Sequence, residues 1–141
     1  MSLANGTDTT TALAIIFDSP ELTELRRQYD RAWPRWPNHI NFICPFVPLE
    51  QFQAVRDRLA PVLAKQDPFT VSMSQLGSFK QGKQLTYHVA FDQPELQALF
   101  KAIRETLPEV PVKHEEFHPH LTLAQGKGLE SKLQASLRTK L

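Results

Sequence analysis

The chain has 141 residues, a formal net charge of +1 at pH 7, 41% hydrophobic residues and 22% charged residues. This length suits one domain with a substantial core, and this composition is typical of a globular protein. The near-neutral charge provides no global basic field that would attract long nucleic acid, so any nucleic-acid ligand should be short or held by a few local cations. The single cysteine, Cys44, excludes an intrachain disulfide and suits a reducing compartment.

The elements predicted along the chain mix strands and helices. Residues 1–10 are polar and lack the pattern of a signal peptide, and no apolar run approaches the ~20 residues of a membrane-spanning helix. We therefore expect a flexible tail at 1–10, a single domain at 11–141 and a cytoplasmic location. Apolar periodicity predicts a strand at 11–18, a helix beginning at Pro20 with Ser19 as its N-cap, a strand at 39–46 and a helix at 49–63. It then predicts a strand at 69–74, a corner at 76–79, a turn at 80–83 and a strand at 85–91. The last predicted elements are a helix at 94–105, a strand at 120–124 and a helix marked by Leu129, Leu133 and Leu137. This order, with at least one antiparallel hairpin, indicates an α+β fold whose helices pack outside the sheets.

Two short segments share one pattern, in which a histidine is followed by an apolar, a small polar and a second apolar residue. They read HINF from His39 and HLTL from His120, and each lies on a predicted strand. Because side chains two positions apart share a face of a strand, His39 points with Asn41 and His120 points with Thr122. Each strand is therefore predicted to present one imidazole and one hydrogen-bonding group on the face away from the core.

With their flanks, PNHINFICPF and FHPHLTL, these segments resemble the 2H phosphoesterase superfamily, which includes the RNA 2′,3′-cyclic phosphodiesterases once named 2′-5′ RNA ligases. That family carries two copies of His-x-Thr/Ser-x, and the resemblance covers nearly the whole chain from Thr11. It implies two βα lobes related by a pseudo-twofold axis, with antiparallel sheets and one histidine motif on each lobe across a central groove. One departure stands out, because Asn41 offers an amide donor where the family has a hydroxyl.

The chemistry explains why two histidines are needed. Hydrolysis of a cyclic phosphodiester requires one proton to be taken from water and one to be given to the leaving oxygen. A histidine pKa near ~6.5 makes both protonation states available near neutrality. We expect His39 and His120 to be catalytic, and Asn41 and Thr122 to bind the non-bridging oxygens of the substrate. Which histidine is the acid is left open.

The expected activity is that of a phosphoric diester hydrolase that needs neither a metal nor another cofactor. Its substrate would be an RNA 2′,3′-cyclic phosphate end or another 2′-linked phosphodiester, or a related cyclic nucleotide such as ADP-ribose 1″,2″-cyclic phosphate. We expect no membrane association and no obligate protein partner, and we expect a monomer.

Two other interpretations stay open. In the first, the protein is a nucleotide- or RNA-binding module that keeps the groove but hydrolyses its ligand only weakly. Asn41, in place of the family's hydroxyl residue, would then mark the loss of activity. In the second, it is a metal-dependent hydrolase that uses His114, His118 and His120, since imidazole is a common zinc ligand. That segment contains a proline and lacks the helical spacing of a zinc motif such as HExxH.

Three further residues carry predictions of their own. His88 lies opposite the apolar face of its strand and either lines the groove or is simply exposed. Trp36 either stacks on a base or packs against its own loop. Cys44 falls on the predicted core face of the strand at 39–46, so we expect a buried, unreactive thiol.

Overall fold

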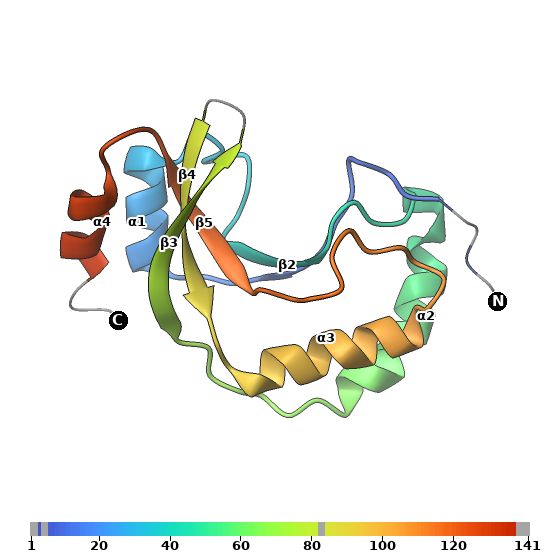
Figure 1. The fold of residues 1–141 in the computed structure, drawn as a ribbon. Helices are drawn as coiled ribbons and strands as arrows, with labels where there is room; N and C mark the ends of the chain where they lie inside the picture. The colour runs from blue at the N-terminus through green and yellow to red at the C-terminus, as the bar shows by residue number, and fades with distance from the viewer. Residues whose placement is uncertain (1–2, 4–5, 82–83, 138–141) are drawn as a thin grey trace. The chain divides into compact units, whose positions relative to one another are not determined.

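The computed structural model describes residue 3 and residues 6–81 and 84–137 (Figure 1). The elements, in chain order, are β1 (Leu13–Ile16), α1 (Pro20–Tyr29), β2 (His39–Ile43), the short 3₁₀ helix η1 (Leu49–Gln51), α2 (Phe52–Ala64), β3 (Met73–Gln81), β4 (Gln84–Phe91), α3 (Pro94–Thr106), β5 (His120–Gln125) and α4 (Glu130–Leu137). Strand β1 pairs with β2, and β3, β4 and β5 form a second, antiparallel sheet in that order. This arrangement confirms the predicted α+β class.

The chain divides into two compact units. Unit 1 contains residues from 1–14, 41–70 and 93–117, and unit 2 contains residues from 15–40, 71–92 and 118–141. Helix α2 packs against α3 in unit 1, and α1 packs against β5 in unit 2. Both histidines predicted to be catalytic belong to unit 2, whereas Asn41 belongs to unit 1. The pseudo-twofold relation between two lobes and the groove between them stay predictions.

Unit 1 is held by aromatic packing and includes part of the predicted tail. The rings of Phe100 and Phe117 stack with centroids 4.5 Å apart, and Phe42 lies 5.1 Å from Phe117. Within the predicted tail, the side chain of Leu3 is buried, and the backbone N–H of Asp8 donates to the Phe46 carbonyl at 2.7 Å. These two residues of the segment at 1–10 are therefore in contact with unit 1.

Helix α1 in unit 2 begins as the sequence predicts. The Ser19 hydroxyl accepts a hydrogen bond from the backbone N–H of Leu22 at 3.4 Å, and Pro20 occupies the first turn. The buried face of the helix consists of Leu22, Leu25 and Arg26. Because that face includes a charged residue, the interior of unit 2 must supply polar partners for it.

Strand β4 is the middle strand of the sheet in unit 2. Its side chains Tyr87, Val89 and Phe91 are buried, as are Leu121 and Leu123 of β5. These residues form the apolar face that the alternation predicted, and the opposite face carries His88 and the second histidine motif. The register places His88 beside Thr122 of β5.

Strand β3 corrects the sequence analysis. The predicted strand at 69–74 and corner at 76–79 are wrong, because β3 begins at Met73 and continues through Gly77 to Gln81. The glycine marks a close approach instead of a strand end, since a Cβ built on Gly77 would lie 2.8 Å from Nε2 of His88. The predicted turn at 80–83 falls partly outside the described residues.

Strand β2 is shorter than predicted and ends at Ile43. Alternation therefore stops before Cys44, which is exposed, so the prediction of a buried thiol is wrong. Among the described residues, no helix is long and apolar enough to cross a membrane.

Candidate active site

The two histidine motifs carry the same local hydrogen bond. Nδ1 of His39 lies 2.8 Å from the carbonyl oxygen of Pro37, and Nδ1 of His120 lies 2.8 Å from the carbonyl oxygen of His118. A carbonyl only accepts, so Nδ1 carries the proton and donates in both rings. In the neutral form of each ring, Nε2 is then the nitrogen with a free lone pair. Strand alternation does not predict this match, although each acceptor lies two residues before its histidine.

The strand faces are those that the motifs predict. Ile40 of β2 and Leu121 and Leu123 of β5 are fully or almost fully buried. His39 is half-buried and His120 is exposed. Asn41 is also exposed, and Thr122 is half-buried. All four predicted site residues thus project from their strands away from the buried set.

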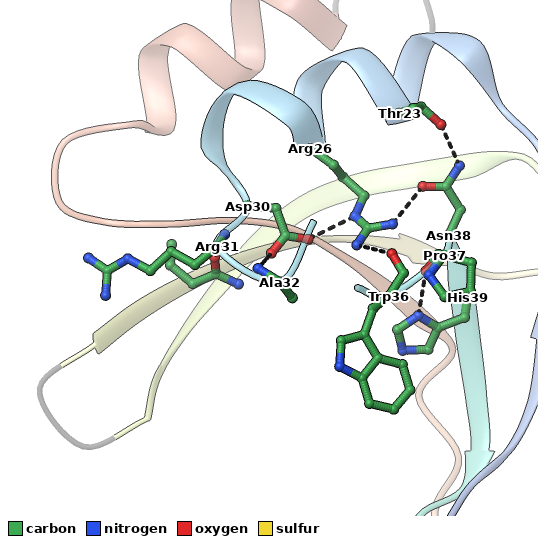
Figure 2. A network of polar contacts seen from close by, with 10 residues as sticks. Thr23, Arg26, Asp30, Arg31, Ala32, Trp36, Pro37, Asn38 and His39 are labelled. Atoms are coloured by element: carbon green, nitrogen blue, oxygen red, sulfur yellow. Dashed lines mark hydrogen bonds and ion pairs between the residues drawn. The ribbon is translucent and has the colours of Figure 1, made fainter. Parts of the chain in front are cut away.

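A buried polar network leads into the first motif (Figure 2). The guanidinium of Arg26 on α1 donates to the Asp30 carboxylate at 2.7 Å, and these two side chains are only 3% and 1% exposed. Its other two nitrogens donate to Oδ1 of Asn38 at 3.0 Å and to the carbonyl oxygen of Trp36 at 2.7 Å. A buried charge is stable only when it is paired and hydrogen-bonded, and two of the partners here, Asn38 and the Trp36 carbonyl, lie just before His39 in the chain. The network therefore fixes the backbone that carries the first histidine.

Trp36 is an exposed ring on a fixed backbone. Its backbone N–H donates to the Ala32 carbonyl at 3.1 Å, and its own carbonyl accepts from Arg26. Trp36 is 48% exposed, and its ring centroid lies 5.5 Å from that of His39. Figure 2 shows the two side chains. Base stacking and packing of Trp36 against its own loop therefore both stay open as interpretations.

The second motif lies in a cluster of three rings on the sheet of unit 2. The His88 ring on β4 meets the His120 ring edge-on, with centroids 5.1 Å apart and planes at 62°. Phe79 on β3 lies 5.7 Å from His88 and 6.4 Å from His120. Burial lowers the pKa of His88, and the neighbouring charge of His120 lowers it further. The His88 ring is therefore half-buried beside His120 and is not simply exposed, and whether it lines a groove stays a prediction.

The two motifs are also connected through the loop that follows α1. The backbone N–H of Arg31 donates to Oε1 of Gln125 at the end of β5, at 2.7 Å. The guanidinium of Arg31 donates to Oε1 of Gln84 on β4 at 3.3 Å. The loop that leads toward the first motif is thus attached to the strand that carries the second.

The described residues include no group of three His, Cys, Asp or Glu side chains that could hold a metal ion. Nothing in that part of the chain therefore favours the metal-dependent interpretation built on His114, His118 and His120. Whether activity needs a metal remains a prediction that chelation tests.

Comparison with known proteins identifies relatives. A family model described as the 2′-5′ RNA ligase superfamily matches residues 17–141. Proteins of Bacillus cytotoxicus and Bacillus cereus, each named "Putative phosphoesterase", are 30% identical to the chain over 116 and 117 residues, which is 79% of this chain and 67% of each relative. A protein of Bacillus anthracis with the same name is 29% identical over 117 residues, with the same coverage. No solved structure gives a significant match.

Proposed function

Because the chain belongs to the 2′-5′ RNA ligase superfamily, we propose that it is a phosphoesterase that hydrolyses cyclic or 2′-linked phosphodiesters with His39 and His120. The preferred substrates are RNA ends with a 2′,3′-cyclic phosphate, or a related small cyclic nucleotide. The names of the Bacillus relatives agree with phosphoester hydrolysis in general.

The observation that carries this proposal is the matched pair of Nδ1 hydrogen bonds. Each bond leaves Nε2 as the nitrogen available for proton transfer, and His39 is partly exposed and His120 is exposed. One neutral ring accepts a proton at Nε2 from the attacking water, whose oxygen forms a bond to phosphorus. The other ring, protonated, donates from Nε2 to the ribose oxygen as its bond to phosphorus breaks. One histidine gains a proton and the other loses one, so the protons balance.

Asn41 and Thr122 have the remaining role. Each lies two residues after a histidine on the same strand, so its polar group is presented on the same side as the imidazole. The amide of Asn41 and the hydroxyl of Thr122 can both donate to the non-bridging oxygens, where charge develops during attack.

The substrate size follows from charge and aromatic exposure. A net charge of +1 does not favour long nucleic acid, whereas one fixed and exposed ring suits a single nucleobase. Trp36, beside His39, is the ring that we assign to base stacking.

The test is a substrate panel with product analysis. Purified protein is incubated with nucleoside 2′,3′-cyclic phosphates, oligonucleotides with cyclic ends, 2′-5′ dinucleotides and ADP-ribose 1″,2″-cyclic phosphate. We expect at least one of them to be opened to a phosphomonoester. If the folded protein binds these nucleotides and hydrolyses none of them, it is a binding module and the proposed hydrolase activity is wrong.

A further inference from the structure

His88 occupies the centre of the sheet that carries the second motif. On one side its register partner is Gly77 of β3, and on the other side it is Thr122 of β5. The middle strand thus places a third imidazole beside His120, in a position that the proton transfers described above do not use.

The neighbouring strand leaves space for this ring. A Cβ built on Gly77 would lie 2.8 Å from Nε2 and 3.0 Å from Cε1 of His88, which is closer than such atoms approach one another. Any side chain at position 77 would therefore displace the His88 ring or the strand. Glycine in the middle of a strand weakens a sheet. Its presence beneath the His88 ring therefore indicates that the space for this ring is important.

The ring seated over Gly77 limits the freedom of His120. The Nδ1–H of His120 is held by the His118 carbonyl at 2.8 Å, and its ring faces His88 at 5.1 Å and Phe79 at 6.4 Å. Aromatic rings at such separations and angles attract one another edge to face. An exposed histidine with only one hydrogen bond would otherwise retain rotational freedom.

His88 itself is not placed for proton transfer. Its Nδ1 is buried without a hydrogen-bond partner among the described residues, and its Nε2 lies over Gly77. Burial and the neighbouring His120 both lower the pKa of His88, which favours an uncharged ring at neutral pH. An uncharged His88 ring can pack against His120 without electrostatic repulsion of its protonated form.

We propose that His88 is a positioning residue, whose ring, seated in the space above Gly77, holds the imidazole of His120 in the orientation that proton transfer needs. This inference rests on the proposed role of His120 and adds to it the third histidine and the glycine. It also explains why a strand of this sheet carries glycine opposite histidine.

The test is a double-mutant cycle measured by kcat and KM on a cyclic nucleotide. His88→Ala should lower kcat by roughly 10- to 100-fold, the scale of a misplaced catalytic group, and leave KM within about twofold. Gly77→Ala should lower kcat in the wild-type background and have almost no further effect in the His88→Ala background, where the ring that it displaces is gone. His88→Phe keeps a ring and should retain most of kcat. His114→Ala, at an exposed histidine outside the site, is the matched control and should change nothing.

A second readout is independent of turnover. In ¹H–¹⁵N spectra of the imidazoles, the Nδ1–H signal of His120 should be sharp in the wild type and in His88→Phe, and broadened in His88→Ala. If no substrate is turned over but this signal responds as stated, the positioning stands and the proposed function fails. If His88→Ala leaves both kcat and the signal unchanged, the inference is overturned. It is also overturned if folded His88→Phe loses as much kcat as His88→Ala, because the ring nitrogens would then be the essential feature.

Discussion

The first and second histidine motifs share one local geometry and are supported by different physics. In both, Nδ1 is bound to the carbonyl two residues earlier at 2.8 Å. Around His39 the support is a buried guanidinium with charged and polar partners, whereas around His120 it is a cluster of rings on a sheet. Both motifs therefore share a requirement for one orientation of the imidazole. A buried polar network supports this orientation around His39, and packed rings support it around His120.

This difference predicts different consequences of damage. Breaking a buried ion pair leaves an uncompensated charge, and it typically costs about 3–5 kcal/mol of stability. Removing one aromatic contact costs about 0.5–1.5 kcal/mol beyond the loss of buried area. Loss of the buried ion pair near the first motif should therefore appear mainly in stability, whereas loss of a ring from the cluster around His120 should appear mainly in kcat.

The largest expected effect is on stability. Arg26→Ala should lower the free energy of unfolding by about 3–5 kcal/mol, because Asp30 is then buried without its partner. Urea denaturation measures this change. Arg27→Ala is the matched control, since its ion pair with Glu24 is about half-exposed on both sides and should contribute little. Equal losses in the two variants would contradict the structural role of the network.

The next effect concerns substrate affinity. Trp36→Ala should raise KM for a nucleoside 2′,3′-cyclic phosphate by roughly 5- to 150-fold, the equivalent of about 1–3 kcal/mol of base stacking. It should leave KM unchanged for a cyclic phosphate that lacks a base. Phe79→Ala, the matched change beside His120, should instead lower kcat for both substrates. A loss with Trp36→Ala that is the same for both substrates would rule out stacking.

A smaller effect concerns the titration of His88. Its pKa should lie below 6.5 in the folded protein, first because of burial and then because of His120. His120→Ala should raise the pKa of His88 only part of the way back, since burial remains, and imidazole NMR measures this shift. A pKa of His88 that is unchanged in His120→Ala would mean that the two rings do not interact.

The same titration links stability to pH. Below pH 6.5 and above the folded pKa of His88, the unfolded chain binds more protons than the folded protein. The contribution of this group to the free energy of unfolding therefore decreases as the pH falls through that window, and it levels off below the folded pKa. In His88→Phe this component should be absent.

The smallest expected effect is that of chelation. EDTA should leave turnover unchanged, because both protons of the proposed reaction pass through imidazoles. Turnover is measured before and after dialysis against EDTA, and again after Zn²⁺ or Mn²⁺ is added. Activity that EDTA abolishes and a metal restores would favour the metal-dependent alternative and require a reinterpretation of His120.

Much of this molecule could be predicted from local patterns. Within the motifs HINF and HLTL, alternation assigned the buried apolar residues and the more accessible polar ones correctly, and the Ser19-Pro20 pair marked the start of α1. The family resemblance is confirmed by the match over residues 17–141.

The supports of the two motifs were not predicted, because they depend on contacts between distant segments. Gly77 was interpreted as a strand end, since nothing in its neighbourhood indicates that a ring from β4 occupies the space above it. Arg26 lies on an otherwise apolar helix face, and only tertiary structure shows which groups satisfy it. In both cases, a residue that departs from the local pattern, Gly77 or Arg26, contributes to the surroundings of a histidine motif.

The central claim is that His39 and His120 act as one acid–base pair. Its most direct test is single-turnover hydrolysis of a nucleoside 2′,3′-cyclic phosphate by His39→Ala, His120→Ala and the double variant, with folding checked by circular dichroism. Each single change should reduce the rate by roughly 10²–10⁴-fold, and the double variant should lose less than the product of the two, because the groups act together. A folded His39→Ala protein that hydrolyses the substrate at the wild-type rate would contradict the account.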